Sequence, residues 1–272
     1  MKAEQAKKLA DDALQSLEDA LKQGKSDALT AYLAAMGRNH QYSYGNVMMI
    51  ATQMPDATRV AGFHTWRKLG RFVKKGEHGI VIIAPMLIKA KEDADAGDTP
   101  DSERSILRFK AVYVFDVSQT DGEPLPVIAR VGGNPNGHTD RLKAHVAARG
   151  ITLEYAEDLG GPDGLSCGGR IRLLSSLSPA EEFSVLTHEL AHEMLHKGER
   201  RSSKTVRETE AEAVAFVVCQ AIGLETGSAA ADYIQLYDGD QATLADSLDA
   251  IQKAAAEIIA AISDEQQPSA EQ

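Results

Sequence analysis

The sequence is poor in the residues and runs that mark secreted and membrane proteins. It has two cysteines in 272 residues, Cys167 and Cys219, and they offer no disulfide framework. A reducing cytoplasm is therefore the expected compartment. No apolar run approaches the roughly 20 residues that cross a membrane, and the charged amino-terminal segment lacks the apolar core of a signal peptide. We expect no membrane partner.

Aromatic residues are scarce too, at 5% of the chain with a single tryptophan, and acidic residues outnumber basic ones by 40 to 29. The resulting net charge of -11 hides an uneven distribution. Residues 36–91 contain nine basic and two acidic side chains, a local charge of +7. The first half of an acidic protein thus contains a basic segment.

Within this basic segment, aromatic residues alternate with charged ones. Single-stranded nucleic acid requires such a mixture, because cations follow the phosphates while aromatic rings stack on unpaired bases. The candidate DNA-binding residues are Arg38, Tyr42, Tyr44, Arg59, Trp66, Arg67, Lys68, Arg71, Lys74 and Lys75. From the residues alone an equal alternative stays open, in which the aromatic rings fill a small core and the lysines keep it soluble.

The second half contains the pattern His-Glu-x-x-His at residues 188–192, in a segment with complete helix signals. Ser178 and Glu181 are spaced as a capping box, Pro179 takes the first helical position, and Gly198 can end the helix. At about 100° per residue, apolar side chains form one narrow stripe and the histidines lie opposite. One face is expected to pack and the other to face a cleft.

Helical spacing places His188 and His192 about 40° apart and roughly 6 Å along the axis, so both imidazoles can bind one cation. Glu189 is turned by about 100° from His188 and can face an activated water instead of the metal. A zinc ion in such a site lowers the pKa of water and polarises a carbonyl. The pattern predicts a zinc hydrolase in which Glu189 is the general base, taking a proton from water and returning it to the leaving amine.

A third ligand must come from elsewhere, because a hydrolytic zinc site keeps three protein ligands and one open position. The next helical segment, residues 206–222, offers Glu208, Glu210 and Glu212. Glu208 and Glu212 share a face, whereas Glu210 points the other way and is the weakest candidate. We predict Glu208 as the ligand and Glu212 as the carboxylate that orients a zinc-bound histidine, with the reverse assignment left open.

His196 continues the histidine series, but it lies about 80° around the helix from His188 and two turns further on. We interpret it as a wall of the cleft or a donor to the developing oxyanion, with a packing role as an equal alternative. No His-x-x-Gly-x-x-His extension follows His192, which excludes a metzincin. A gluzincin-like site is the remaining prediction.

The order of elements predicts an α+β protein with two domains. The first mixes helices with a β-hairpin, whose strands bracket an acidic segment. The second carries the metal helix, the glutamate helix and a strand at residues 168–174. This strand could lie at a sheet edge beside the cleft, where an extended peptide could pair with it, and an ordinary structural strand is an equal alternative. The predicted divisions are a DNA-binding domain at 1–126, a linker at 127–137, a zinc peptidase domain at 138–265 and a disordered tail at 266–272.

Several motifs of the first domain match, in order, the amino-terminal single-stranded-DNA-binding domain of ArdC-type antirestriction proteins. They lie at residues 42–46, 55–70, 73–79, 83–86 and 114–120. The second half is similar to the zinc peptidase domain of the same proteins and of the ImmA/IrrE metallopeptidases, through His188-Glu-Leu-Ala-His192 and Glu208-Thr-Glu-Ala-Glu212. In those families a glutamate followed four residues later by an acidic or amide residue completes the site, which agrees with Glu208.

The resemblance implies a single-stranded-DNA-binding module joined to a zinc metallopeptidase, with plasmid- or phage-type defence evasion as the family's role. The expected partners are single-stranded DNA and a protein substrate, with restriction enzymes or other DNA-bound proteins as candidates. One alternative is a DNA-protecting protein without peptidase activity, whose zinc is structural. Another is a binding module whose acidic surface mimics DNA.

Overall fold

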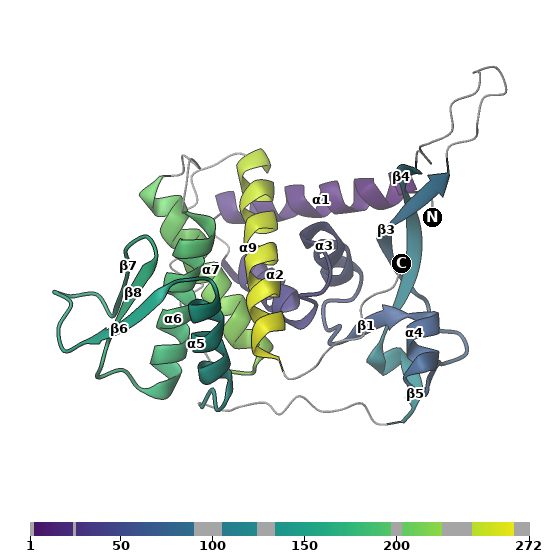
Figure 1. The fold of residues 1–272 in the computed structure, drawn as a ribbon. Coiled ribbons are helices and arrows are strands. Elements are labelled where there is room, and N and C mark those ends of the chain that lie inside the picture. The colour runs from purple at the N-terminus through teal and green to yellow at the C-terminus, as the bar shows by residue number, and fades with distance from the viewer. Residues whose placement is uncertain are drawn as a thin grey trace, which may run out of the picture. The chain divides into compact units, whose positions relative to one another are not determined.

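The computed structural model describes residues 3–23, 26–89, 105–123, 134–196, 203–224 and 241–263 (Figure 1). The chain forms two compact units, the first made of residues 1–13 and 48–123 and the second of residues 14–47 and 124–272. This division differs from the predicted boundary at residue 126, because residues 14–47 group with the second unit. Most of the predicted linker and the whole predicted tail lie outside the described residues.

The first unit contains an antiparallel sheet with the strand order β1-β4-β3 and a separate two-stranded ribbon, β2-β5. The strands are β1 (Val60–Gly62), β2 (Arg71–Val73), β3 (Ile80–Lys89), β4 (Ser105–Asp116) and β5 (Thr120–Gly122). The predicted hairpin is confirmed, and its strands run from the pair Ile80–Val114 to the pair Lys89–Ser105. The acidic segment between them lies outside the described residues.

Short helices complete the first unit, and two longer ones contribute residues to both units. The helices are α4 (Phe63–Lys68), the 3-10 helix η1 (Val117–Gln119), α1 (Ala3–Lys22) and α3 (Tyr44–Gln53). The side-chain amide of Gln53 holds β3 by accepting from Val81 N at 3.0 Å and donating to Val81 O at 2.9 Å. The end of α3 is therefore tied to the edge of the sheet.

The buried carboxylate of Asp116 joins the end of β4 to the chain before β1. It accepts hydrogen bonds from the backbone N–H groups of Thr58 at 2.8 Å, Arg59 at 3.0 Å and Ser118 at 3.0 Å. Burial alone would raise the pKa of Asp116, but these hydrogen bonds outweigh it and lower that pKa below its usual value. The ionised form is thus the one that the fold stabilises.

The second unit combines helices with a three-stranded sheet. Its elements are α2 (Ser26–Arg38), α5 (His138–Ala148), β6 (Thr152–Ala156), β7 (Gly164–Ser166), β8 (Arg170–Leu174), α6 (Pro179–Leu195), α7 (Lys204–Ala221) and α9 (Gln241–Ile262). The strand order is β6-β8-β7, with β8 parallel to β6 and antiparallel to β7. The predicted strand at 168–174 exists as β8, but its predicted place at a sheet edge is wrong, because β7 pairs with its other side.

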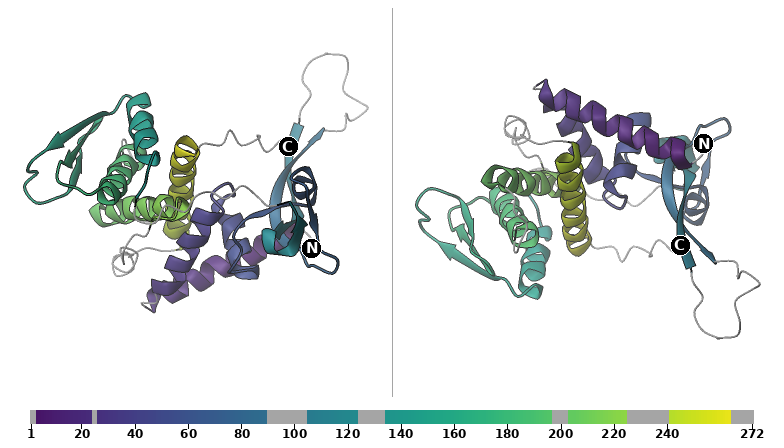
Figure 2. Two further views of the ribbon diagram at one scale, coloured as in Figure 1. Left: turned by 90° about the horizontal axis from the view of Figure 1, so that it is seen from below. Right: turned by 90° about the horizontal axis from the view of Figure 1, so that it is seen from above.

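Helix α6 lies at the centre of this unit, between the sheet and the other helices (Figure 2). Three residues of its predicted apolar stripe, Phe183, Leu186 and Leu190, are each 0% exposed. Helix α2 meets α7 at Gly37, where an added Cβ would lie 2.9 Å from the carbonyl oxygen of Val217. Among the described helices, none is long and apolar enough to span a membrane.

Candidate metal centre

Helix α6 begins at Pro179, where the local sequence signals predict its start. Ser178 and Glu181 form the capping box, in which Ser178 N donates to Glu181 Oε2 at 2.8 Å and Glu181 N donates to Ser178 Oγ at 3.5 Å. Pro179 occupies the first helical position, and the helix ends at Leu195. Gly198, the predicted stop, lies outside the described residues. The His-Glu-x-x-His pattern is therefore held on a regular helix.

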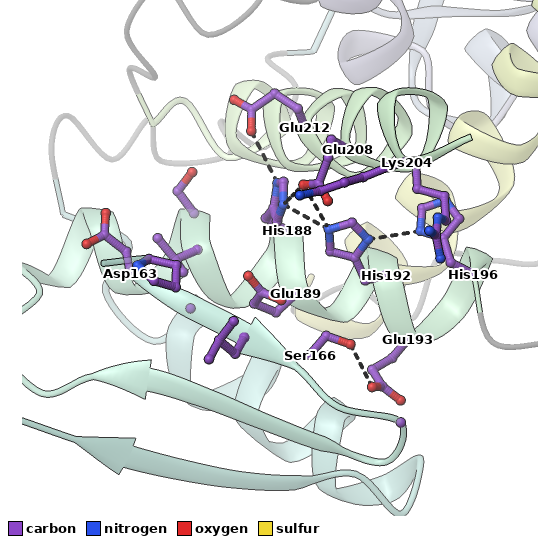
Figure 3. A pocket seen from close by; sticks show the side chains of 17 residues that line it. Asp163, Ser166, His188, Glu189, His192, Glu193, His196, Lys204, Glu208 and Glu212 are labelled. Atoms are coloured by element: carbon purple, nitrogen blue, oxygen red, sulfur yellow. Dashed lines mark hydrogen bonds and ion pairs between the residues drawn. The ribbon is translucent and has the colours of Figure 1, made fainter. Parts of the chain in front are cut away.

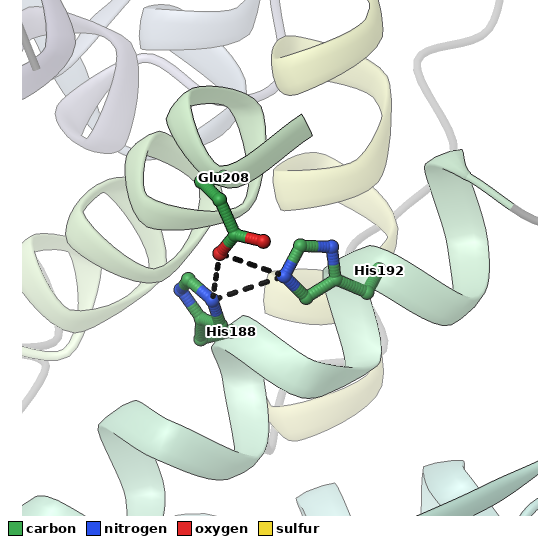
Figure 4. Close-up of side chains that lie close together, drawn as sticks. All are labelled: His188, His192 and Glu208. Atoms are coloured by element: carbon green, nitrogen blue, oxygen red, sulfur yellow. Dashed lines mark hydrogen bonds and ion pairs between the residues drawn. The ribbon is translucent and has the colours of Figure 1, made fainter. Parts of the chain in front are cut away.

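Helices α6 and α7 bring together three side chains that could hold a metal ion, His188, His192 and Glu208 (Figure 4). His188 Nε2 lies 3.1 Å from His192 Nε2, and Glu208 Oε2 lies 3.6 Å from the former and 3.4 Å from the latter. Ligand atoms bound at about 2.0–2.1 Å in a tetrahedral zinc site are separated by about 3.3 Å, a spacing that follows from the bond length and tetrahedral angle. The three atoms therefore have the spacing that one such ion needs.

Glu212 contacts the other nitrogen of His188. Its Oε2 lies 3.2 Å from His188 Nδ1, one helical turn beyond Glu208 on the same face of α7. A carboxylate in this position orients a ligand imidazole and keeps the hydrogen on Nδ1, which leaves Nε2 available for a metal. The geometry favours Glu208 as the third ligand and Glu212 as the orienting carboxylate.

His196 and Glu210 pair with each other behind His192. His196 Nδ1 lies 2.9 Å from His192 Nδ1, and His196 Nε2 lies 3.0 Å from Glu210 Oε2. His196 is one of the residues that line the cavity, as the interpretation as a wall of the cleft predicts. Both of its ring nitrogens are engaged, so it is neither a free oxyanion donor nor a plain packing residue. Glu210 points away from the metal ligands as predicted, but sequence reasoning missed its contact with His196. The sequence did contain a signal for such a buried contact, because Glu210 lies on the apolar side of α7 beside the buried Val214 and Val217.

The three candidate ligands line a cavity of about 970 Å³, which is also lined by Glu189 and strand β7 (Figure 3). Glu189 is 7% exposed and accepts a hydrogen bond from the backbone of Ser166. Gly164 lies so close that an added Cβ would be 2.9 Å from Glu189 Cγ. Strand β7, and not β8, is therefore the edge strand beside the cavity.

Glu193 ties α6 to the turn between β7 and β8. Its buried carboxylate accepts from Ser166 Oγ and from Gly169 N, each at 2.7 Å (Figure 3). Because Ser166 also contacts Glu189, the position of the edge strand and that of the Glu189 carboxylate depend on each other. The backbone of β7 is therefore held at a defined distance from the metal-binding side chains.

The charges of the site shift the pKa values of its residues in different directions. Burial opposes protonation of His188, but the hydrogen bond to Glu212 and the nearby carboxylates, including Glu189 and Glu208, outweigh it and raise the pKa of His188. Burial, followed by the proximity of His188, lowers the pKa of His192 to about 4. Burial also raises the pKa of Glu189, with His188 opposing and Glu208 adding to the effect. The environment thus favours a neutral His192 ring and strengthens Glu189 as a proton acceptor.

The ten predicted DNA-binding residues belong to different units. Arg38, Tyr42 and Tyr44 are part of the second unit, and the other seven are part of the first. Arg38 is exposed, while Tyr42 and Tyr44 are half-buried, and burial raises the pKa of Tyr42 to about 12. The phenol of Tyr42 therefore stays neutral at physiological pH.

Trp66 and Arg71 have structural contacts in the first unit. Trp66 is 0% exposed and donates its indole N–H to Phe115 O at 2.9 Å, so the prediction that its ring stacks on a base is wrong. The core alternative holds for this residue. The guanidinium of Arg71 donates to Thr120 Oγ1 at 2.8 Å and to Thr120 O at 3.0 Å, which joins β2 to β5.

The remaining predicted cations of the first unit reach the surface to different degrees. Arg67, Lys68, Lys74 and Lys75 are exposed, and Arg59 is half-buried. Lys74 also donates to Ser118 O at 2.9 Å. The same unit exposes aromatic rings that are not among the predicted DNA-binding residues: Phe63 at 45%, Phe72 at 58%, Phe109 at 58% and Tyr113 at 50%. Phe109 and Tyr113 share one face of β4, because residues four apart in a strand point the same way.

Residues 3–115 match a family model. The model is that of the N-terminal domain of anti-restriction factor ArdC. The predicted resemblance of the first part of the chain to ArdC is thereby confirmed, whereas the resemblance of the second half to ImmA/IrrE metallopeptidases stays a prediction.

Two crystal structures of the antirestriction ArdC protein from plasmid R388 are similar in fold. The metal-free structure is 22% identical, with a TM-score of 0.52 over 82% of this chain and 86% of that chain. The Mn(II)-bound structure is also 22% identical, with a TM-score of 0.50 over 82% of this chain and 85% of that one. The mixed α+β fold of ArdC is therefore shared by most of the chain.

An uncharacterized protein of Bacillus anthracis, pXO2-81, is 25% identical over 245 residues. The matched region is 73% of this chain and 41% of that protein, so the chain spans less than half the length of this relative.

Proposed function

We propose that this chain is a zinc-dependent peptidase joined to a single-stranded-DNA-binding module. The observation that carries the peptidase is the convergence of one atom each from His188, His192 and Glu208 within 4.8 Å, in a cavity that also contains Glu189. Two imidazoles and one carboxylate form a ligand set typical of hydrolytic zinc sites, and imidazole suits zinc better than it suits manganese or magnesium. Zinc is therefore the metal that we propose.

A zinc ion held by these residues would polarise a substrate carbonyl and lower the pKa of water. His188 and His192 would hold the ion through Nε2, and Glu212 would keep the His188 ring in the required orientation. Glu189, held by the backbone of Ser166, accepts a proton from the attacking water and delivers it to the leaving amine. Strand β7 lines the cavity at the edge of its sheet, where backbone groups can pair with an extended peptide.

The test of the peptidase is Glu189→Gln, which preserves shape and removes the proton acceptor. We expect this variant to bind zinc like the wild type and to lose hydrolysis of a fluorescence-quenched peptide library by at least about 100-fold, the lower range of general-base contributions. Glu182→Gln is the matched control, because Glu182 lies on the same helix and contacts Lys143 at 2.8 Å instead of lining the cavity. Equal turnover by the wild type and Glu189→Gln would refute the assignment.

The DNA-binding part of the proposal rests on the exposed cations and rings of the first unit. Replacing Lys68 and Lys75 by glutamine should reduce the salt dependence of single-strand affinity by about 0.7 per lost phosphate contact. Replacing Phe109 or Tyr113 by alanine should weaken binding by about 1–3 kcal/mol without changing that salt dependence. Lys253→Gln, on α9 of the second unit, is the charge control. Unchanged affinity of all four variants for a labelled oligonucleotide would contradict this part.

The similarity to anti-restriction factor ArdC favours a second candidate, a DNA-protecting protein whose metal is structural. In that case Glu189→Gln would leave protection of DNA in a restriction assay unchanged, whereas removal of a ligand would lower stability. A peptidase-dependent mechanism predicts that Glu189→Gln abolishes protection while the protein stays folded and keeps its zinc.

A further inference from the structure

A series of hydrogen bonds leads from His192 through His196 to two buried residues, Glu210 and Ser247. His192 Nδ1 lies 2.9 Å from His196 Nδ1, the first contact of this series (Figure 3). His196 Nε2 lies 3.0 Å from Glu210 Oε2, and the other oxygen of Glu210 accepts from Ser247 Oγ at 2.6 Å. This series of hydrogen bonds thus connects His192, a proposed metal ligand on α6, with α7 and α9.

The residues of this series beyond His192 are shielded from water. The side chains of His196 and Glu210 are 4% and 0% exposed, and Ser247 is 2% exposed. A buried carboxylate is costly unless hydrogen bonds reach its oxygens. Glu210 therefore favours the arrangement in which His196 and Ser247 both donate to it.

The positions of the hydrogens follow from this arrangement. A neutral imidazole carries one N–H, so a His196 ring that donates from Nε2 has a bare Nδ1 that can only accept. The hydrogen between the two rings must then belong to His192 Nδ1. His192 Nε2 is left with a free lone pair, directed at the point where His188 Nε2 and Glu208 Oε2 converge.

The two metal-binding histidines are thus held in different ways. His188 contacts its carboxylate directly, and the side chain of Glu212 is 38% exposed, so water can partly replace it. The Nδ1 side of His192, by contrast, reaches a carboxylate through a second imidazole, and the side chains of that imidazole and of Glu210 are 4% and 0% exposed. Loss of this carboxylate would leave the tautomer of two rings undetermined.

We propose that Glu210 and His196 are positioning residues of the metal site, in which the buried carboxylate fixes the tautomer of His196 and His196 fixes the tautomer and orientation of His192. This inference rests on the metal-binding part of the proposed function. Glu210 acts on the metal only through the two rings, so its contribution is visible in the metal-free protein as well.

The test uses the whole polypeptide with the substitution Glu210→Met, which keeps the length of the side chain and removes its charge and its hydrogen-bond acceptors. NMR of the imidazole nitrogens in the metal-free protein reports which nitrogen of His192 carries the hydrogen. We expect Nδ1 in the wild type and a mixture of tautomers in Glu210→Met. Competition with a chelator for Zn²⁺ should show an affinity loss of about 10- to 100-fold, the usual effect of removing such a partner.

Conservative and matched variants separate positioning from a general effect on folding. Glu210→Gln, whose amide oxygen can still accept from His196, should restore the Nδ1 tautomer and most of the affinity. Thr209→Val, at the neighbouring buried position on α7, should change neither. If Glu210→Met does not fold, the pair His196→Phe with Glu210→Met replaces both polar groups by apolar ones of similar size, a change that buried ion pairs often tolerate.

The outcomes distinguish this inference from the proposed function. A neutral His192 ring that carries its hydrogen on Nε2 in the wild type would overturn the positioning role of Glu210 and His196. Glu210→Met with an unchanged His192 tautomer and unchanged Zn²⁺ affinity would overturn it too. A wild type that binds no metal but carries the hydrogen on Nδ1 of His192 would refute the metal site and would still support the positioning role of Glu210 and His196.

Discussion

Separate removal of the Glu208 and Glu212 carboxylates of α7 tests the ligand assignment most directly. Glu208 Oε2 lies 3.4 and 3.6 Å from the two Nε2 atoms, whereas Glu212 Oε2 lies 3.2 Å from the opposite nitrogen of His188. Under the proposed assignment, Glu208→Ala removes a metal ligand, and Glu212→Ala removes an orienting group. The two variants should differ in how much metal affinity they lose and in what the metal's coordination becomes.

The expected losses follow from the energy of a zinc site. Structural zinc binding is worth about 10–16 kcal/mol over four protein ligands, so one ligand accounts for roughly 3 kcal/mol, which is about a 150-fold loss of affinity. Loss of an orienting partner costs about 10- to 100-fold. We therefore expect Glu208→Ala to lose at least about 150-fold in affinity and Glu212→Ala to lose less.

Chelator competition with Zn²⁺ measures both affinities, and the absorption spectrum of the Co²⁺-loaded protein reports the coordination number. Glu208→Ala should change the spectrum, because an oxygen ligand is lost, while Glu212→Ala should keep the wild-type spectrum. The reverse result, with a changed spectrum and the larger loss in Glu212→Ala, would refute the reasoning and make Glu212 the third ligand.

Two further predictions concern the groups that support the two units. Asp116→Asn places an amide donor against at least one backbone N–H of Thr58, Arg59 or Ser118 and should destabilise the protein by about 1–3 kcal/mol in urea unfolding at neutral pH. Because folding lowers the pKa of Asp116, the stability contributed by its ionised carboxylate is present above the unfolded pKa and is lost as pH falls through the folded pKa. The difference in unfolding free energy between the wild type and the variant should therefore disappear in acid. A difference that does not change with pH would contradict this. Gly164→Ala puts a Cβ 2.6 Å from Val185 Cγ1 and 2.9 Å from Glu189 Cγ, so it should displace Glu189 and reduce peptide hydrolysis by about 100-fold with unchanged zinc affinity. Wild-type turnover by Gly164→Ala would show that the position of Glu189 does not limit the reaction.

Local patterns were sufficient to predict the elements that carry the site. The capping box at Ser178 and the proline at 179 define the start of α6 through contacts within one turn, and these depend on no other part of the chain. The spacing of His188 and His192 and the shared face of Glu208 and Glu212 follow from helical periodicity alone. The hairpin of β3 and β4 was also predicted, from two strand-like runs on either side of the acidic segment.

Partners distant in sequence could not be predicted in this way. The pairing of β7 with β8 decides which strand borders the cavity, and a short strand with a glycine gives little periodic signal. Trp66 lies among basic residues, as a base-stacking ring would, yet it is buried and its indole N–H donates to the backbone oxygen of Phe115, 49 residues away. The grouping of residues 14–47 with the second unit likewise depends on the close approach of α2 and α7 at Gly37.

The sequence by itself determined the chemistry available to this protein: two imidazoles and a carboxylate at helical spacings, a neighbouring glutamate, and a basic segment in an acidic chain. Only the tertiary structure decided which of these groups meet, and it assigned Glu210 to His196 and β7 to the rim of the cavity. The physical reason is that spacing along a helix orients side chains over one or two turns, whereas burial and hydrogen bonding between helices depend on packing across the whole unit.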